Sequence, residues 1–497
     1  MKSGTRSKSL DRLSYNRSWV PVFLGLLFSS AACDAEQLAL TNGTVINPAD
    51  GRVLHNALVV IEGDTITTSG NNILPPNGAK LIDCNGKFIL PGYIDTHVHF
   101  FQSADLFTRP DAVDLNTIRP YKEEVAWIKS HLDDTFARYL RCGITSVVDV
   151  GGPMWNFEVR KRANGAAKAP RVAVAGPLIS SVARPQLDLG DPPIVKIDTP
   201  EQGREFVRKL ARENPDFVKI WYIVPPAPSP SPGASPDAKQ TDVARAAMFR
   251  PVVHAVVEES HALKLRVAVH ATELEAARNS VEEGADLLVH SVTDKPVDDA
   301  FVKLLKDHHT MLTPTLVVFE RYGRTFANKL ELTPEEKAWG NPEVVASLDV
   351  TKLPKDNVPE RIKTAICAPD AVLARIQEAY DVALKNLNTL EDAGVTIAAG
   401  TDAGNIGTIH GASLFREFQL MKQAGLKPMQ ILQCATANAA KVFGGETGAR
   451  IGEIAPGKFA DLVILNSNPA EDIGRASDIQ MVIKNGVSYP ADAILAK

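Results

Sequence analysis

The segment PGYIDTHVHF, residues 91–100, brings together residue types that can bind a metal ion. Its apolar residues run into Asp95, His97 and His99, and one residue separates each of these from the next. Side chains alternate between the two faces of a strand, so in a strand these three would share one face. Two imidazoles on one face can bind the same divalent ion. The spacing therefore predicts a metal site that begins at this segment.

Other apolar runs of the chain end in residues that suit the same chemistry, namely Lys219, His270, His290 and Asp402. A single histidine at the end of a strand is usually structural, but the whole set at successive strand ends is hard to explain by chance. Neutral imidazoles and a carboxylate can hold a divalent ion, which lowers the pKa of its bound water and polarises a carbonyl group. The set therefore predicts metal-assisted hydrolysis.

The middle of the chain, residues 91–444, contains the elements that must bring these residues together. It alternates β-rich apolar runs with helical patterns, which is typical of βα units and a parallel sheet. The runs lie at residues 92–100, 144–151, 171–179, 216–223, 265–271, 285–291, 311–319 and 395–402. They predict an α/β fold, a (β/α)8 TIM barrel with its active site at the C-terminal ends of the strands.

Two insertions interrupt this regular pattern. Residues 224–237 are rich in proline and serine, so we expect an extended loop at the mouth of the barrel. A long stretch, residues 320–386, separates the last two runs, and residues 370–390 are amphipathic. We expect a helix there, in an insertion of the kind that often forms a lid.

The two ends of the chain have a different texture. Residues 34–90 and 445–497 alternate apolar and polar residues between turn signals, which indicates short antiparallel strands. Neither half is large enough to be stable alone. We therefore expect both halves to form one small composite β-sandwich domain, with the barrel inserted between them.

The first 33 residues resemble an export signal. Basic residues precede the apolar run WVPVFLGLLF, which ends in the small residues SSAAC, so we expect an exported protein. The end of the segment resembles the lipobox of bacterial lipoproteins, and Cys33 is either lipidated or lies near an ordinary cleavage site. The protein would then be periplasmic or anchored to the membrane. A net charge of −5 and the absence of a basic cluster argue against nucleic acid as a partner.

The histidine pair of residues 97–99, the strand-end His270 and His290, and the motif GTDAG at residues 400–404 resemble the amidohydrolase superfamily. The passages ATANAAKVFG and GEIAPGKFADLVIL are similar to the C-terminal part of its imidazolonepropionase and prolidase-like branch. The resemblance covers nearly all of the chain after the leader.

This resemblance implies a site with two divalent metal ions, expected to be zinc. His97 and His99 would hold one ion, and His270 and His290 the other. Lys219, carboxylated by CO2, would bridge them, and Asp402 would bind the first ion. A metal-activated hydroxide would attack the scissile carbonyl, with Asp402 handling its proton. Without the modification of Lys219, a single ion with Asp402 as base remains workable.

Four further residues are weaker candidates for substrate binding, and each has an ordinary structural alternative. Trp221 and Tyr222 follow Lys219, although only Trp221 shares its face of the strand. His410 faces the substrate or caps the next helix. Arg184, in the loop after the third run, either pairs with a substrate carboxylate or is a solvated charge.

The substrate is left open by the sequence. The branch often has a glycine-rich, histidine-containing stretch after the third strand and a glycine pair after the lysine, but this chain has GPLISSVARPQLD and KIWYIVPPAPSP there. We therefore expect a hydrolase of amide or other non-peptide C–N bonds, linear or cyclic, in a small molecule. An X-Pro dipeptidase, an esterase or lactonase, and a non-catalytic surface-anchored binding protein are the alternatives. We also expect a homo-oligomer.

Overall fold

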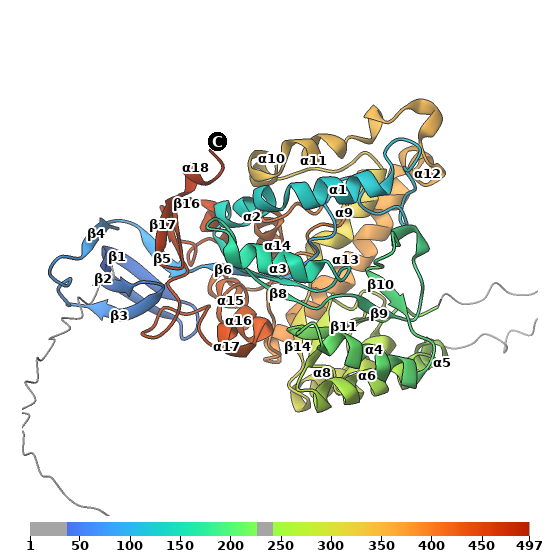
Figure 1. Cartoon of the computed structure of the whole chain (residues 1–497), viewed down its shortest axis with the longest axis horizontal. Helices are drawn as coiled ribbons and strands as arrows, with labels where there is room; N and C mark the ends of the chain where they lie inside the picture. Colours follow the sequence, from blue (N-terminus) through green and yellow to red (C-terminus); the bar gives the residue numbers. More distant parts are fainter. Residues whose placement is uncertain (1–36, 226–241, 497) are drawn as a thin grey trace, which may run out of the picture. The chain divides into compact units, whose positions relative to one another are not determined.

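The computed structural model of the protein describes residues 37–225 and 242–496, and Figure 1 labels many of its elements. The expected export signal with Cys33, and most of the proline-rich segment 224–237, lie outside the described residues. Among the described residues, no helix combines the length and the apolar character that crossing a membrane requires.

Strands from both ends of the chain pair in one eight-stranded sheet. β5 (Phe88–Pro91) runs antiparallel to β15 (Leu462–Leu465), and this pair joins the two halves. The order is β17-β16-β15-β5-β1-β2-β3, with β4 paired to β1. The remaining strands are β1 (Gln37–Asn47), β2 (Arg52–Glu62), β3 (Thr65–Asn71), β4 (Lys80–Asp83), β16 (Ile479–Lys484) and β17 (Val487–Pro490). The two expected half-sheets thus pair with each other in one hydrogen-bonded sheet, and this pairing does not by itself establish the two layers of a sandwich.

A shared apolar cluster explains why both ends of the chain are needed for this sheet. Leu40 and Val59 come from the first half, Leu462 and Ile483 from the second, and all four are buried together. Each buried aliphatic side chain contributes about 1.5–3 kcal/mol relative to an exposed one. Either half alone would leave its part of this cluster in water.

The middle of the chain forms two parallel sheets. One has the order β6-β7-β8 and the other the order β10-β9-β11-β12-β13-β14, and every pair in them is parallel, as expected. The strands are β6 (Tyr93–Val98), β7 (Ile144–Asp149), β8 (Arg171–Val174), β9 (Leu178–Ser180), β10 (Ile194–Lys196), β11 (Phe217–Trp221), β12 (Arg266–His270), β13 (Leu287–Val289) and β14 (Met311–Thr313).

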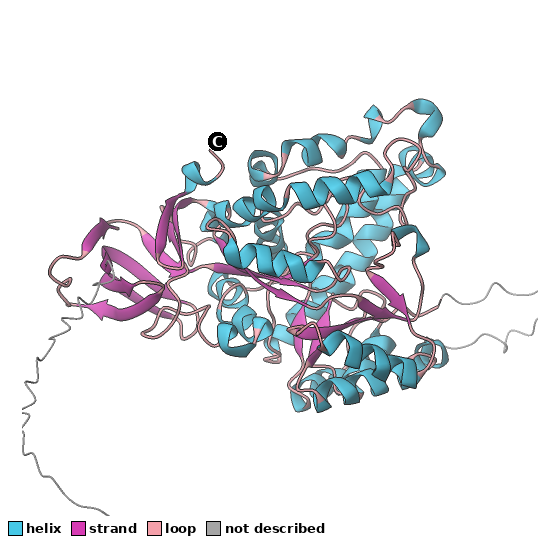
Figure 2. Cartoon of the chain, in the orientation of Figure 1, coloured by secondary structure: helices cyan, strands magenta, loops and turns pink. Residues whose placement is uncertain are grey.

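Helices flank these strands, as Figure 2 shows. They are α1 (Tyr121–Ser130), α2 (Leu132–Arg141), α3 (Asn156–Gly165), α4 (Pro200–Ala211), α5 (Asp242–Ala247), α6 (Arg250–Ala262), α7 (Leu274–Glu282), α8 (Asp299–Asp307), α9 (Leu316–Phe326), α10 (Pro334–Trp339), α11 (Pro342–Ser347), α12 (Glu360–Cys367), α13 (Pro369–Asp392), α14 (Ser413–Gln423), α15 (Pro428–Cys434), α16 (Ala437–Phe443), α17 (Gly445–Gly448) and α18 (Ala491–Ile494). The helix expected over residues 370–390 is confirmed as α13, which packs against α9 and buries Tyr380 and Leu387.

Two of the expected strands break or end well inside their apolar runs. The run 171–179 is divided into β8 and β9 at Gly176, whose φ of 78° lies in the left-handed region. The run 311–319 is a strand only to Thr313, and its second half, from Leu316 on, belongs to helix α9. Pro314 has no N–H for a ladder and Thr315 has a φ of 48°, so the strand cannot continue through them.

The eighth expected strand, residues 395–402, is not a regular strand. Isolated bridges join Ile397 to Leu312 of β14 and Ala403 to Val98 of β6, so this segment links the two parallel sheets. The strand pairing therefore does not by itself establish a closed barrel. A Cβ on Gly400 would lie 2.9 Å from the backbone nitrogen of His97, and only glycine permits this approach.

Candidate active site

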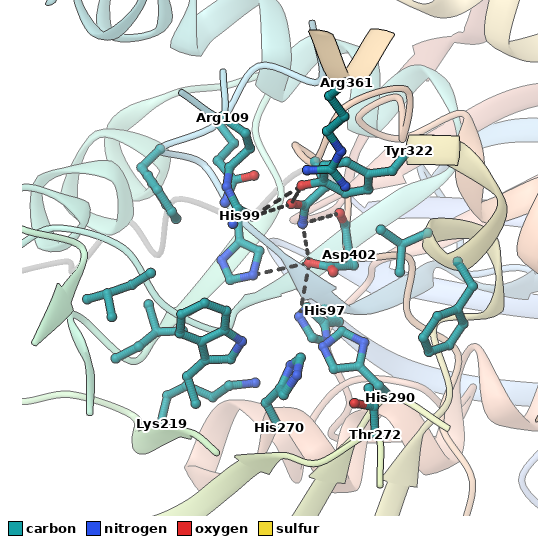
Figure 3. A pocket seen from close by; sticks show the side chains of 18 residues that line it. His97, His99, Arg109, Lys219, His270, Thr272, His290, Tyr322, Arg361 and Asp402 are labelled. Carbon is teal, nitrogen blue, oxygen red and sulfur yellow. Dashed lines mark hydrogen bonds and ion pairs between the residues drawn. The ribbon is translucent and has the colours of Figure 1, made fainter. Parts of the chain in front are cut away.

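A cavity of about 380 Å³ lies where the parallel strands end. Figure 3 shows the side chains that line it. Six of them are the residues that the sequence singled out as metal ligands, namely His97, His99, Lys219, His270, His290 and Asp402. The strands and the segment 395–402 thus bring residues that are remote in sequence into one space.

His97, His99 and Asp402 form the tightest cluster of this cavity. The Nε2 atoms of His97 and His99 lie 3.2 and 3.1 Å from Oδ1 of Asp402. One ligand atom from each of the three residues lies within 4.8 Å of the others, the arrangement of a candidate metal site. The φ of Asp402 is 61°, so the backbone turns there and presents the carboxylate to the two imidazoles.

His270 and His290 complete the group from the neighbouring strands. His270 is the last residue of β12 and His290 directly follows β13. Their ring centroids are 4.4 Å apart, and the ring of His290 lies 4.8 Å from that of His97. The four imidazoles therefore converge from three strands, and Asp402 joins them from the segment that replaces the eighth strand.

Hydrogen bonds orient two of the imidazoles. Nδ1 of His99 lies 2.6 Å from the carbonyl oxygen of Gly151, and Nδ1 of His290 lies 2.6 Å from Oγ1 of Thr315. With the proton on Nδ1 in both rings, each leaves the Nε2 lone pair for the cavity, as metal-binding histidines commonly do. Asp149 accepts a hydrogen bond from the backbone nitrogen of Gly151 and so holds the turn that carries this carbonyl.

Burial keeps the imidazoles of His97, His270 and His290 neutral. It lowers the pKa of His97 to about 3 and the pKa values of His270 and His290 well below the ordinary value. For Asp402, burial by itself would raise the pKa, but the contact with His97 holds it well below its usual range. Neutral imidazoles beside an ionised carboxylate are the protonation states in which these groups bind a divalent metal ion.

Lys219, on β11, is buried among these groups. Its exposed fraction is 1%, and Nζ has no hydrogen-bond partner among the described residues. Burial lowers the pKa of its amine to about 7. The ring nitrogens of His97 also have no hydrogen-bond partner of good geometry in the described part of the chain. Unsatisfied buried polar atoms of this kind need an explanation, and a bound metal with a modified lysine would supply one.

A hydrogen-bonded network that sequence reasoning did not find supports Asp402. Asn405 donates from Nδ2 to Oδ1 of Asp402 at 2.7 Å. Its Oδ1 accepts from Nη1 of Arg109 at 2.7 Å and from the hydroxyl of Tyr322. Figure 3 shows this network above Asp402. The only signal for it in the sequence is the position of Asn405 three residues after Asp402, because Arg109 and Tyr322 come from remote segments.

The four weaker candidates lie in different places. Trp221 lines the cavity, with its ring centroid 5.9 Å from that of His270. Tyr222 is fully buried outside it, and its hydroxyl donates to the carbonyl of Ala246. His410 is also outside, because Nδ1 lies 2.8 Å from the Tyr139 hydroxyl and Nε2 lies 2.8 Å from the carbonyl of Gln102. Arg184 lines an adjoining cavity.

Comparisons with known proteins identify the family of this chain. The model of the "Amidohydrolase family" matches residues 88–488. Ochratoxinase of Aspergillus niger is 23% identical over 478 residues, which cover 89% of this chain and 84% of that protein. A solved Xaa-Pro dipeptidase with bound methionine has a TM-score of 0.66 at 23% identity and covers 92% of this chain and 100% of its own. Molinate hydrolase has a TM-score of 0.65 at 22% identity, covering 93% and 96%. The chain therefore belongs to the amidohydrolase family and is a hydrolase of carbon–nitrogen bonds.

Proposed function

We propose that this protein is a metal-dependent hydrolase that cleaves an amide, or another non-peptide C–N bond, in a small molecule. His97, His99 and Asp402 would hold one divalent ion, and His270 and His290 a second, with zinc suited to both sets. The observation that carries the proposal is the convergence of four imidazoles, a lysine and a carboxylate on one cavity. When bound, the ions would polarise the scissile carbonyl and make water acidic enough to attack it.

Lys219 has the properties that carboxylation requires. Only a neutral amine can attack the carbon of CO2, and the nitrogen releases one proton as the carbamate forms. Burial lowers the pKa of the Lys219 amine to about 7, so that a large share of it is neutral at neutral pH. The resulting carbamate would be an anionic ligand that bridges the two ions. It would also occupy the place where Nζ now has no partner among the described residues.

Asp402 is suited to proton transfer during hydrolysis. Its Oδ1 accepts from Asn405 and faces the two imidazoles, so Oδ2 is left to take the proton of the attacking water. The same oxygen would then give this proton to the leaving nitrogen, which completes the cleavage of the C–N bond.

The walls of the cavity indicate what the rest of the substrate is like. Leu178, Ile194, Trp221, Val318 and Phe319 line it beside the polar groups. Such walls favour an apolar or aromatic substituent next to the scissile bond. The proposal therefore places aryl and branched alkyl amides first, with Xaa-Pro dipeptides second because a solved dipeptidase shares the fold.

The barrel, the terminal segments and the leader also have proposed roles. We propose that the parallel strands and residues 395–402 close as a (β/α)8 barrel over residues 91–444, and that residues 34–90 and 445–497 form the composite β-sandwich. Residues 1–33 would direct export to the periplasm, with Cys33 as the site of lipid attachment. The folded protein would assemble with copies of itself, which light scattering of the purified protein would test.

Metal content tests the core of the proposal. Elemental analysis of the purified protein should find about two divalent ions per chain, and Lys219→Ala should lower that number. The intact protein should hydrolyse N-acyl amines faster than matched esters, lactones or Xaa-Pro dipeptides. One ion that the variant retains would leave a mononuclear enzyme built on His97, His99 and Asp402. The absence of metal, together with no hydrolysis, would contradict the proposal and favour a binding protein.

A further inference from the structure

Arg361, on helix α12 of the insertion, is a cation at the mouth of the cavity without a carboxylate partner among the described residues. Its Nη1 donates to the carbonyl of Ala112 at 2.7 Å, and the guanidinium lies 5.0 Å from the ring centroid of Phe326. A guanidinium has five N–H donors, so these two contacts hold the side chain in place and leave most donors to solvent.

The other arginines of this region already have a carboxylate partner, which they share. Arg109 forms a two-point ion pair with Asp111, at 2.7 and 2.8 Å. Its third nitrogen, Nη1, donates hydrogen bonds to Asn405 and to the hydroxyl of Tyr322. Nε of Arg184 lies 3.4 Å from the same carboxylate of Asp111. Because Asp111 is shared between two arginines, the charge of Arg361 is left for a ligand.

Arg361 also has a suitable place relative to the catalytic groups. In Figure 3 it lies with Arg109 and Tyr322 on one side of the cavity, across from Lys219, His270 and Thr272. A substrate whose scissile bond lies at the imidazoles would therefore extend toward Arg361. A planar guanidinium matches a carboxylate in two parallel hydrogen bonds.

We propose that Arg361 binds the carboxylate of the substrate and so selects N-acyl amino acids over neutral amides. This inference rests on the proposed hydrolase function and adds the substrate class. A guanidinium that has no carboxylate partner among the described residues suits a singly charged carboxylate, while the apolar walls receive the acyl group. The residue comes from the insertion that precedes the eighth barrel segment, so the specificity would be set outside the strands.

Steady-state kinetics of two matched amides test this proposal. N-benzoylglycine carries the carboxylate, and N-benzoylethanolamine has a hydroxyl in its place. Arg361→Gln should lower kcat/KM for N-benzoylglycine by roughly 10- to 100-fold, mainly through KM, as expected for the loss of a charge-assisted hydrogen bond. The value for N-benzoylethanolamine should change less than about threefold, and Arg361→Lys should restore part of the preference.

Arg375→Gln is the matched control, because Arg375 is an exposed arginine on α13 that does not line the cavity. It removes the same charge and should leave the preference between the two amides unchanged. Equal preferences in the wild type and Arg361→Gln would overturn the proposal. Thermal melting of all variants separates loss of recognition from loss of folding.

Binding without turnover separates this proposal from the proposed function. Calorimetry would compare 3-phenylpropanoate with the neutral 3-phenylpropanamide on the protein as purified. Arg361→Gln should lose the preference for the anion, whereas Arg375→Gln should keep it, because any direct contact between a metal and the carboxylate is the same in both. If neither benzoyl amide is hydrolysed but this difference holds, the anion site stands and the proposed hydrolysis of aryl amides fails. An unchanged preference in Arg361→Gln overturns the anion site.

Discussion

At the scale of single residues, the orientation of Asp402 depends on one amide. Asn405 is buried, and its Nδ2 donates a hydrogen bond to Oδ1 of Asp402. Its own Oδ1 accepts hydrogen bonds from Arg109 and Tyr322. Asn405 thereby links Asp402 to Arg109, whose side chain is held in place by its ion pair with Asp111. Asn405 is therefore a positioning residue, because it acts on the reaction through Asp402.

Asn405→Ala should lower kcat by about 10- to 100-fold, the usual effect of losing a group that orients a catalytic or metal-binding side chain. The KM for a neutral amide should change less than about threefold, because Asn405 fixes the proton-transfer group and not the walls of the cavity. Steady-state kinetics would measure both constants. Asn388→Ala on α13, outside the cavity, is the control and should leave kcat unchanged. A rise in KM with unchanged kcat would contradict this role.

At the scale of elements, helix α9 forms one wall of the cavity and needs a fixed position. It carries Val318, Phe319 and Tyr322 of the lining. From its buried side, Nη2 of Arg321 donates to Oε1 of Glu336 on α10 at 2.8 Å, and both side chains are fully buried. Ser413 at the start of α14 donates to the same oxygen. One carboxylate thus ties three helices together.

Glu336→Ala should lower the free energy of unfolding by about 3–5 kcal/mol, because it removes the closer carboxylate of the buried Arg321 and leaves only Glu320, 3.7 Å from Nε. Urea unfolding followed by circular dichroism would measure the change. Glu331→Ala, at an exposed position before α10, should stay within about 0.5 kcal/mol of the wild type. A loss below about 1 kcal/mol for Glu336→Ala would mean that the three helices do not depend on this carboxylate.

At the scale of the whole molecule, a buried charge cluster connects the composite sheet to the parallel strands. Asp461, beside β15, lies 3.0 Å from Nζ of Lys484 on β16 and 2.9 Å from Nε of Arg171 at the start of β8. Its Oδ1 also accepts from the backbone nitrogen of Asn485 at 2.8 Å. Burial by itself would raise the pKa of Asp461, but these cations and this hydrogen bond lower it.

Asp461→Ala should therefore lower the free energy of unfolding by about 3–5 kcal/mol at neutral pH, because two cations lose their buried partner. The folded-state pKa of Asp461 is below its unfolded value, so its stabilisation is present above that unfolded value and is lost as the pH falls through the folded one. The difference between wild type and variant should shrink in acid below the ordinary carboxyl pKa of 3.8. Denaturant unfolding across pH would measure it, with the exposed Asp492→Ala as control. A difference that grows in acid would contradict this assignment.

The sequence by itself determined the features that follow from local spacing. The alternation in residues 91–100 put His97 and His99 on one face, and the positions of His270 and His290 at strand ends follow from parallel strands ending at one edge. The sequence also placed Lys219 at a strand end, but it lies in the middle of β11 and lines the same cavity. The helical period predicted α13, and the alternating ends of the chain predicted strands that pair across it. In each case neighbours along the chain carry the signal, because strand and helix geometry repeats every few residues.

Only the tertiary structure decided which remote groups meet at the cavity. The cavity is lined by Arg109, Tyr322 and Arg361, which come from segments whose local sequence patterns do not predict this. Tyr222 and His410 instead form hydrogen bonds outside the cavity. Residues 395–402 read as a strand, yet the turn at Asp402 leaves only isolated bridges. The physical reason is that such contacts depend on how insertions pack against strands far away in sequence, and hydrophobic periodicity says which face is buried but not what it is buried against.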